Sequence, residues 1–357
     1  MNLFETLGRL GHEQIVFFQH RDTALRCMIA IHSTVLGPAL GGLRMWPYAD
    51  EADALRDILR YSKSMTYKAA IAGLNLGGAK AALIGNPETD KSEPLFRALG
   101  RFIGSLGGRY IAAEDVGTTV DDMELIRQET PHVVGVHQAV GGSGDPSRFT
   151  ALGTLHGIRA CLDYKYGHQE LSRVSFAVQG AGQVGYHLVR ALRQAGAKVF
   201  VTDINEERVE QVVNECGAEA VPMSQIYDVD ANVFSPCALG AVINEDTLPR
   251  LCCEIVAGGA NNQLESDELG TELEARGILY APDYAINAGG LMNSALELRG
   301  YNEEQAHRGV ARIYTIMARI FATAQRDQIP TWQAANQLAE ERIALMGRVK
   351  LPFTSQR

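Results

Sequence analysis

A glycine-rich turn between a short apolar strand and a helix is the feature that most limits how this 357-residue chain can fold. Apolar residues 174–178 lead into Gly180, Gly182 and Gly185, spaced as G-x-G-x-x-G, and a helical pattern follows over 184–195. The first glycine permits a tight turn, the second lets backbone approach a ligand, and the third lets helix and strand pack closely. The next strand, 198–202, ends in Asp203. This arrangement predicts a dinucleotide-binding domain.

The same segment indicates which dinucleotide is bound. A carboxylate at the end of the second strand accepts hydrogen bonds from a ribose 2′-hydroxyl and repels a 2′-phosphate, so Asp203 favours NAD over NADP. The alternative is that the glycines only shape a turn, but a strand, a helix and an acid in the expected places argue against it. We therefore expect cofactor contacts from Gly180, Ala181, Gly182, Gln183, Val184, Gly185 and Asp203.

The two halves of the chain differ in their patterns. After residue 150, Val- and Ile-rich strands at 174–178, 198–202, 232–235, 254–257 and 278–281 alternate with helices, which predicts a parallel sheet covered on both faces. The first half opens with a helix over 3–10 and a hairpin of strands 14–20 and 25–33. It continues with helices at about 50–72, 93–106 and 119–130. The glycine-rich segments 37–44 and 73–80 are expected to be loops.

These patterns predict an α/β protein of two domains. Residues 1–135 are expected to form an N-terminal α/β substrate-binding and oligomerisation domain with a mixed sheet. Residues 136–330 are expected to form an NAD-binding, Rossmann-like, doubly wound sheet. The C-terminal helix, 331–357, is expected to pack back on the first domain. The glycine-rich segment 135–147 is the candidate hinge.

Composition excludes several classes of function. The net charge is −9 and no basic run occurs, so no nucleic-acid partner is expected. No apolar run approaches the ~18 residues of a membrane span. The nine histidines lack metal-ligand spacing, so no metal site is expected. The six cysteines are scattered and no secretory signal precedes them, which favours reduced thiols and a cytoplasmic location.

Two lysines and one aspartate are candidate catalytic residues. Lys68 lies near the end of the helix predicted to reach about residue 72, and Lys80 follows Gly77 and Gly78. Each could be an ordinary surface lysine, but apolar and glycine residues surround both. Asp115 follows a predicted strand, where carboxylates commonly face a ligand crevice. A desolvated lysine near another cation can serve as a base. Oxidation of an amino acid needs such a base, a cation for the α-carboxylate and a proton carrier.

At this point the sequence closely resembles the Glu/Leu/Phe/Val dehydrogenase family over nearly its whole length. The resemblance is carried by GPALGGLRMWPY (37–48), MTYKAA (65–70), AGLNLGGAK (72–80), AEDVGTTV (113–120), the glycine fingerprint, SPCALGAVINEDT (235–247), GGANNQL (258–264) and YAPDYAINAGG (280–290). It implies reversible oxidative deamination of an apolar L-amino acid (leucine, valine or isoleucine) to its 2-oxo acid, with NAD as cofactor. It also implies two domains that close around the substrate, and a homo-oligomer, typically an octamer.

The resemblance assigns roles to particular residues. Lys68 binds the α-carboxylate with Asn262, Lys80 polarises the carbonyl oxygen and activates water, and Asp115 relays protons to and from the amino nitrogen. The remaining substrate contacts are Leu40, Gly41, Gly42, Met65, Ala113, Leu291 and Ser294. Further cofactor contacts are Thr150, Cys237, Ala238 and Asn261.

Three departures from the family pattern leave questions open. Ala79 stands where the family has a third glycine, and a positive φ there would be strained. Arg148 and Phe149 replace a Pro-Val pair. Ser294 replaces the valine of branched-chain enzymes, and its smaller side chain could admit phenylalanine or tryptophan. Leu40 gives no partner to a side-chain carboxylate, which excludes glutamate. An aromatic amino acid dehydrogenase is therefore the second hypothesis, and a non-catalytic NAD-binding regulatory protein is the third.

Overall fold

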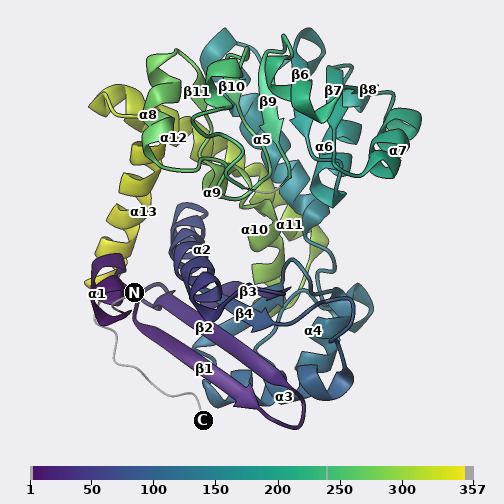
Figure 1. Cartoon of the computed structure of the whole chain (residues 1–357). Coiled ribbons are helices and arrows are strands. Elements are labelled where there is room, and N and C mark those ends of the chain that lie inside the picture. Colours follow the sequence, from purple (N-terminus) through teal and green to yellow (C-terminus); the bar gives the residue numbers. More distant parts are fainter. Residues whose placement is uncertain (1–2, 239, 350–357) are drawn as a thin grey trace. The chain divides into compact units, whose positions relative to one another are not determined.

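The computed structural model describes residues 3–238 and 240–349, which form two compact units (Figure 1). Unit 1 consists of Met1–Gly144, Glu297–Tyr301 and Gln337–Arg357. Unit 2 consists of Asp145–Leu296 and Asn302–Asn336. The chain therefore passes several times from one unit to the other.

A five-stranded mixed sheet forms the centre of unit 1, as predicted. Its order is β1-β2-β4-β3-β5. Strand β2 is antiparallel to both β1 and β4, whereas β3 is parallel to β4 and β5. The strands are β1 (Gln14–His20), β2 (Leu25–Ser33), β3 (Ala39–Trp46), β4 (Gly77–Ile84) and β5 (Tyr110–Glu114).

Helices cover both faces of this sheet. The bounds are α1 (Leu3–Leu10), α2 (Glu51–Ile71), α3 (Glu93–Ser105) and α4 (Val120–Arg127). Asp50 caps the N-terminus of α2 by accepting a hydrogen bond from the Asp53 backbone N–H. On one face of the sheet, α2 buries Ile58 and Leu59; on the other, α3 and α4 bury Phe96, Leu99, Met123 and Ile126.

The prediction of loops at 37–44 and 73–80 was wrong for residues 39–44 and 77–80, which belong to the buried strands β3 and β4. Glycines are unusual in strand interiors, and here they allow close packing. A Cβ on Gly41 would overlap the Ala79 carbonyl of the neighbouring strand, and a Cβ on Gly78 would overlap the Thr66 backbone of α2. The glycines thus bring two strands and a helix closer than side chains would permit.

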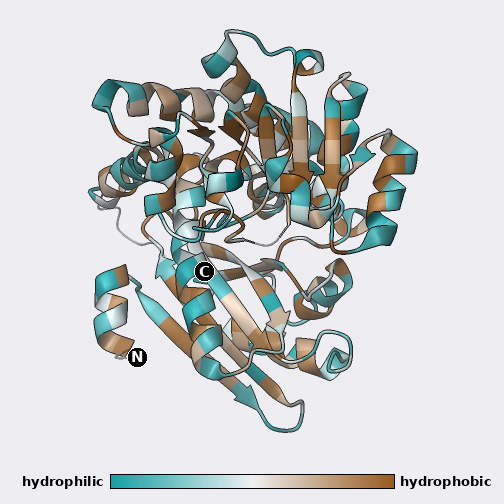
Figure 2. Ribbon diagram, turned by 45° about the horizontal axis from the view of Figure 1, so that its top comes forward, coloured by the Kyte–Doolittle hydropathy of each residue, from teal (hydrophilic) through white to brown (hydrophobic). Residues whose placement is uncertain are grey.

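Unit 2 contains the predicted parallel sheet, with six strands in the order β11-β10-β9-β6-β7-β8. Figure 2 shows hydrophobic residues running along the strands. The strands are β6 (Ser175–Gln179), β7 (Lys198–Thr202), β8 (Glu219–Ala220), β9 (Val233–Pro236), β10 (Ile255–Val256) and β11 (Leu279–Tyr280). The chain moves from β6 to β7 on one side and later places β9 on the other, so β6 marks the topological switch point.

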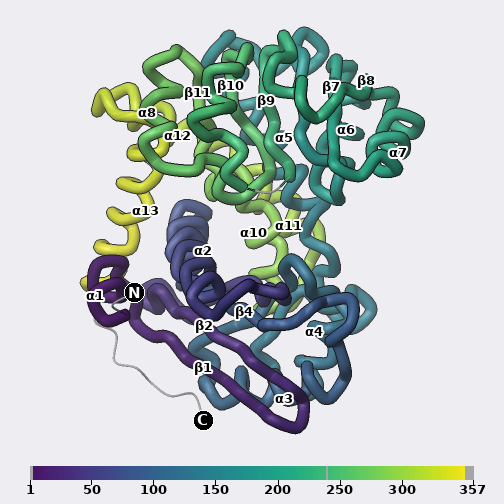
Figure 3. The backbone as a smooth tube through the Cα atoms, viewed as in Figure 1, coloured from purple at the N-terminus to yellow at the C-terminus, as the bar shows by residue number. Residues whose placement is uncertain are grey.

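The helices that begin in unit 2 are α5 (Ser147–Tyr166), α6 (Gln183–Gln194), α7 (Glu206–Cys216), α8 (Glu268–Ala275), α9 (Asp283–Ile286), α10 (Gly289–Ala295), α11 (Glu303–Ala311), α12 (Ile313–Asp327) and α13 (Thr331–Gly347). Figure 3 lets the chain be followed into α13, whose later residues belong to unit 1. There Arg342 donates hydrogen bonds to the carbonyls of Ala70 and Leu74, at the end of α2. No helix in the described part of the chain combines the length and hydropathy needed to cross a lipid bilayer.

Candidate active site

Alternation along the strands of unit 1 places the predicted residues on one face of the sheet. Ala39, Leu43 and Met45 of β3 pack in the core shared with α3 and α4. Since successive side chains of a strand point to opposite faces, Leu40, Gly42 and Arg44 lie on the α2 face. The same alternation places Lys80 of β4 on this face, because Ala79 and Ala81 belong to the opposite core.

Lys80 and Asp115 form an ion pair on this face. Lys80 Nζ donates to Asp115 Oδ2, and the two side chains are only 4 and 19% exposed. Asp115 follows β5 in a turn held by Thr118, whose hydroxyl accepts from the Asp115 backbone N–H. Thr119, not Asp115, caps α4. A Cβ on Gly42 would overlap the Asp115 side chain, so any larger residue at position 42 would displace the carboxylate.

The surroundings of Asp115 favour its ionised form. Burial alone would raise the pKa of this carboxyl, but the cations of Lys80 and Arg44 hold the pKa below its usual value. Asp115 Oδ1 also accepts a hydrogen bond from the Val116 N–H at 2.7 Å. The carboxylate is therefore charged at neutral pH and can exchange a proton with a bound group.

Sequence reasoning missed the part that Arg44 and Tyr61 play in this site. Arg44 Nε lies 3.5 Å from Asp115 Oδ1, and its Nη1 donates to Asp57 Oδ2 at 2.9 Å. The Arg44 guanidinium carbon and Lys80 Nζ each lie 4.7 Å from the centroid of the Tyr61 ring. Arg44 could have been found by the two-residue period from Gly42, had residues 37–44 been predicted as a strand.

The other predicted residues of unit 1 lie nearby on the same elements. Lys68 is buried in the last turn of α2, three residues after the half-buried Met65. Leu40 is 2% exposed and pairs with Gly78 and with Ile111, and Gly42 pairs with Ala113. Ala79 lies in extended strand β4 and is not among the residues with positive φ. The expected strain at Ala79 is therefore absent.

The glycine fingerprint lies at the switch point of the sheet in unit 2. Gly180 follows β6 with φ +111°, and a Cβ there would press against the backbone of Cys237 and Ala238, which follow β9. A Cβ on Gly185 would overlap the Gly180 carbonyl. Around Gly182, by contrast, only the tip of the Arg208 side chain comes within 4.0 Å of such a Cβ. Two glycines thus serve packing, and the third leaves its backbone accessible.

The start of α6 and the end of β7 complete this loop. Helix α6 begins at Gln183 and Val184, and no side chain caps its N-terminus. Its first N–H groups are therefore suited to an anionic group such as a pyrophosphate. Asp203 follows β7, and its carboxylate accepts hydrogen bonds from the backbone N–H groups of Ala181 at 2.6 Å and Asn205 at 2.9 Å. These residues fit a bound dinucleotide.

Asn262 has two features expected of a ligand contact. Its φ is +49°, which is uncommon outside glycine, and its Nδ2 is buried without a hydrogen bond among the described residues. The surrounding loop is fixed by Asp283, which accepts from the Gln263 N–H, and by Asn287, whose Nδ2 donates to the Asn261 side chain. Asp283 and Asn287 thus fix the shape of the loop, and the Asn262 amide remains able to donate a hydrogen bond to a bound ligand.

The remaining predicted residues of unit 2 lie on α5 and α10. Leu291 and Ser294 are both buried on α10. Thr150 lies in the first turns of α5, where its hydroxyl donates to the Pro146 carbonyl at 3.1 Å. Beside it, Arg148 pairs with Glu303, and the buried Phe149 ring lies 5.0 Å from that of His307. The Arg148-Phe149 departure therefore alters packing between α5 and α11.

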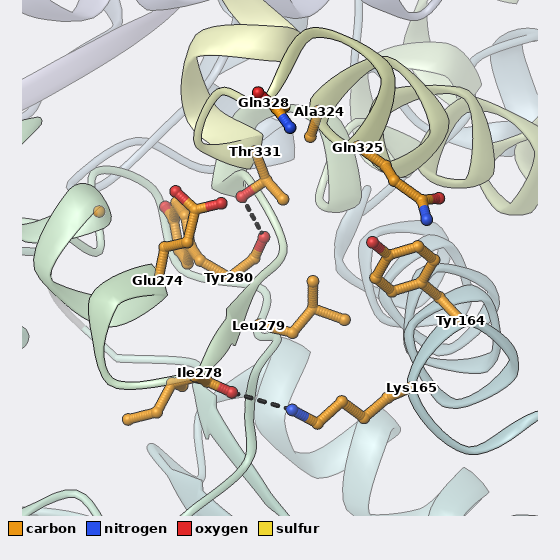
Figure 4. A pocket seen from close by; sticks show the side chains of 12 residues that line it. Tyr164, Lys165, Glu274, Ile278, Leu279, Tyr280, Ala324, Gln325, Gln328 and Thr331 are labelled. Atoms are coloured by element: carbon orange, nitrogen blue, oxygen red, sulfur yellow. Dashed lines mark hydrogen bonds between the residues drawn. The ribbon is translucent and has the colours of Figure 1, made fainter.

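A separate cavity of about 270 Å³ in unit 2 is lined by none of the predicted site residues (Figure 4). It lies beside the edge strand β11, between Tyr164 and Leu279. Lys165 Nζ donates to the Gly277 carbonyl at 2.9 Å, and the Thr331 hydroxyl donates to the Tyr280 carbonyl at 2.7 Å. The Thr331 contact covers a carbonyl of the edge strand, which limits pairing of this edge with another strand, whereas the Lys165 contact holds the turn before β11. Elsewhere, residues 3–238 and 240–349 contain no cluster of His, Cys, Asp or Glu suited to a metal ion.

A glycine fingerprint at the switch point of a parallel sheet is typical of nicotinamide-dependent dehydrogenases. Residues 12–132 match the Glu/Leu/Phe/Val dehydrogenase dimerisation domain, and residues 201–349 match the model described as Glutamate/Leucine/Phenylalanine/Valine dehydrogenase. A leucine dehydrogenase of Thermoactinomyces intermedius is 51% identical over 353 residues, which cover 99% of this chain and 96% of that protein. The chain therefore belongs to the Glu/Leu/Phe/Val dehydrogenase family.

Two further relatives show the range of the family. A phenylalanine dehydrogenase of Bacillus thermotolerans is 47% identical over 351 residues, covering 97% of this chain and 91% of that protein. The crystal structure of L-tryptophan dehydrogenase from Nostoc punctiforme superposes with a TM-score of 0.82 at 44% identity, covering 97% of this chain and all of that one. The protein is an amino acid dehydrogenase, an oxidoreductase whose fold takes a nicotinamide cofactor.

Proposed function

We propose that this protein catalyses the reversible, NAD-dependent oxidative deamination of branched-chain L-amino acids (leucine, valine and isoleucine) to 2-oxo acids and ammonium. The observation that carries the proposal is the buried Lys80–Asp115 ion pair packed against Gly42. The glycine at position 42 leaves the Asp115 carboxylate room to reach Lys80, as an active-site pair would need. The relative with 51% identity is a leucine dehydrogenase, which favours this substrate class.

In this proposal each charged side chain of unit 1 has a defined role. Lys68 binds the α-carboxylate of the amino acid, together with the Asn262 amide. Asp115 receives a proton from the substrate amino group, because it is ionised at neutral pH. Lys80 first gives up its own proton to solvent, then takes a proton from the water that attacks the imine carbon, and as a cation it polarises the carbonyl oxygen of the product. Gly41 and Gly42 leave room for the α-carbon, and Leu40, Met65 and Ala113 contact the apolar side chain.

A bound NAD would supply the acceptor for the hydride of the substrate α-carbon. Gly180, Ala181, Gly182, Gln183, Val184 and Gly185 would hold its pyrophosphate, and Asp203 would accept from the ribose hydroxyls. Thr150, Cys237, Ala238 and Asn261 are proposed as further contacts. The Asp203 carboxylate would repel a 2′-phosphate, which favours NAD over NADP.

Aromatic substrates are the second candidate, and Ser294 is the observation that favours them. Ser294 is 5% exposed on α10, one turn from Leu291. A serine is smaller than the valine that branched-chain enzymes carry there, so it could leave room for a phenylalanine or tryptophan ring. A difference of about one methylene changes preference by only ~1–3 kcal/mol.

We further propose that the protein is a cytoplasmic homo-oligomer, an octamer by its resemblance to the branched-chain enzymes. The name of the matched N-terminal model, a dimerisation domain, supports self-association. The six cysteines are all free thiols, which is typical of a reducing compartment. Light scattering coupled to size-exclusion chromatography measures the subunit number directly.

A panel of amino acids tests the proposal. Initial rates with leucine, valine, isoleucine, phenylalanine and tryptophan are followed by NADH absorbance, with NAD and then with NADP. We expect the highest kcat/KM with a branched-chain substrate and NAD. Faster turnover of phenylalanine or tryptophan would make the second candidate correct. NAD binding without turnover of any substrate would instead identify a regulatory protein.

A further inference from the structure

Asp115 contacts two cations through different oxygens. Lys80 Nζ donates to Oδ2, whereas Arg44 Nε lies 3.5 Å from Oδ1. Arg44 Nε is buried and has no hydrogen-bond partner among the described residues. A small movement of the Arg44 or Asp115 side chain would therefore form a second charge-assisted hydrogen bond to Asp115.

Arg44 is anchored away from Asp115. Its Nη1 donates to Asp57 Oδ2 at 2.9 Å, and the Tyr48 hydroxyl donates to the same oxygen at 2.6 Å. Its guanidinium carbon lies 4.7 Å from the Tyr61 ring centroid. The Arg44 side chain is 17% exposed. Arg44 is therefore held in one position by α2, independently of what Lys80 does.

The charges in this cluster sum to zero when all four groups are ionised. Lys80 and Arg44 are cations, and Asp57 and Asp115 are anions. In the proposed reaction Lys80 gives up its proton, after which Asp115 would be a partly buried carboxylate without a cation. Such a carboxylate tends to take up a proton, because burial favours the neutral form. A second cation that never deprotonates removes this tendency, and arginine is the side chain with that property.

We propose that Arg44 is a positioning residue that keeps Asp115 ionised and correctly oriented while Lys80 exchanges its proton. The proposal rests on the proposed function for the roles of Lys80 and Asp115. Arg44 itself needs no contact with substrate, since it acts through the Asp115 carboxylate. The charged and titratable groups around Asp115 are Lys80 on β4, Arg44 on β3, Asp57 and Tyr61 on α2, and Tyr110 on β5.

Three variants of the full-length protein test this role. The pH dependence of kcat/KM for L-leucine with NAD is measured for wild type, Arg44→Gln, Arg44→Lys and Asp57→Asn. The titration of Asp115 is followed separately by ¹³C NMR of labelled aspartate carboxyls, assigned with Asp115→Asn. The matched control is Arg101→Gln, which removes an exposed arginine from its pair with Glu129 on the same unit.

The variants are expected to shift the pH dependence of kcat/KM in different directions. Arg44→Gln shifts the acidic limb and the Asp115 titration to higher pH by about one unit and lowers kcat by about tenfold, with KM for leucine changed less than about threefold. Arg44→Lys restores most of the shift, because it keeps the charge. Asp57→Asn shifts the acidic limb and the Asp115 titration to lower pH, because Asp115 is then the remaining carboxylate beside Arg44. Arg101→Gln follows wild type.

An unchanged acidic limb and an unchanged Asp115 titration in a folded Arg44→Gln protein would overturn the proposal. If Arg44→Gln does not fold, Asp57→Asn decides, since a purely structural role for Arg44 predicts no shift in that variant. If wild type oxidises none of the amino acids tested, the proposed function fails. The NMR titration then still decides whether Arg44 controls the ionisation of Asp115.

Discussion

The two units build their proposed sites from different materials. In unit 1 the site consists of charged side chains that are already paired, with Lys80 and Arg44 on either side of Asp115. In unit 2 the fingerprint consists of backbone, shaped by Gly180 and Gly185. One site comes from three strands and a helix that are distant in sequence, whereas the other lies mostly within six consecutive residues.

This difference predicts how each site responds to change. A site made of charges is sensitive to the loss of one side chain and to pH, because each group sets the ionisation of its neighbours. A site made of backbone is sensitive to added bulk and to changes in loop shape. Variants in unit 1 should therefore affect the chemical step, and variants in unit 2 should affect cofactor affinity.

The largest expected effect is a loss of turnover through unit 1 with nearly unchanged NAD binding in unit 2. Lys80→Ala removes the proposed base and leaves Asp115 without its hydrogen-bonded cation, so kcat should fall by about 1,000-fold or more. NAD affinity should change less than about twofold, because the fingerprint is in unit 2. Stopped-flow turnover and calorimetric titration with NAD measure these quantities.

Lys91→Ala is the matched control for this prediction. Lys91 forms another lysine–aspartate pair of unit 1, at 2.5 Å from Asp122, but it lies outside the proposed site. Its replacement should leave kcat near the wild-type value. Comparable losses in the two variants would mean that Lys80 contributes only stability, and the contrast between the units would then fail.

The same contrast explains what the sequence could predict. The fingerprint was located residue by residue, because strand, turn and helix are contiguous and each glycine has a local reason to be there. The hairpin of β1 and β2, with its boundaries, was predicted correctly from two strand-like runs separated by a short polar turn. Local patterns thus accounted for the parallel sheet of unit 2 and the edge of the sheet in unit 1.

The centre of unit 1 could not be predicted in the same way. Residues 39–46 contain two adjacent glycines, which locally favour a loop, and only their pairing with β4 and β5 makes them a strand. That error hid Arg44, whose importance depends on sharing a face with Gly42 and on meeting Asp57 and Tyr61 of α2. Lys68, Lys80 and Asp115 were proposed from their surroundings in sequence, but the pairing of Lys80 with Asp115 depends on the register of the sheet.

The second prediction concerns acid stability of unit 1. His12 and His32 pack edge to face at 4.8 Å, and burial lowers the pKa of each to about 4. In the unfolded chain both have a pKa of about 6.5, so the unfolded state binds more protons between these values. The contribution of the two neutral histidines to the free energy of unfolding is therefore fully present above about pH 6.5. It falls as the pH decreases toward 4, by on the order of 2 kcal/mol after allowance for partial exposure.

The two tryptophans allow this prediction to be assigned to one unit. Trp46 lies in unit 1 and Trp332 in unit 2. Urea unfolding is followed in Trp332→Phe and Trp46→Phe proteins near pH 7.5 and about pH 5. The Trp46 transition should move to lower urea at the acidic pH by more than the Trp332 transition. His12→Gln should reduce that movement, whereas replacement of the exposed His20 should not. Equal movement of both transitions would contradict the comparison.

The third prediction tests the backbone site of unit 2. Asp203→Asn keeps the shape of the side chain but removes the charge that accepts from the Ala181 N–H. The Kd for NAD should rise by about tenfold, corresponding to ~1.4 kcal/mol, and the preference for NAD over NADP should narrow. KM for the amino acid at saturating cofactor should stay within about twofold. Glu206→Gln, an exposed acid at the start of α7, is the control and should bind NAD like wild type. Unchanged NAD affinity in Asp203→Asn would remove Asp203 from the cofactor site.

The smallest expected effect decides which unit sets the substrate preference. The proposed function assigns side-chain contacts to both units, among them Leu40 in unit 1 and Ser294 in unit 2. Ser294→Val restores the residue of branched-chain enzymes, so the ratio of kcat/KM for leucine over phenylalanine should rise by about fivefold, or ~1 kcal/mol. Thr323→Val makes a comparable hydroxyl-to-methyl change at a buried position of α12 and should leave the ratio unchanged. If Ser294→Val also leaves it unchanged, Ser294 does not set the preference, which then belongs to Leu40 and its neighbours on the α2 face.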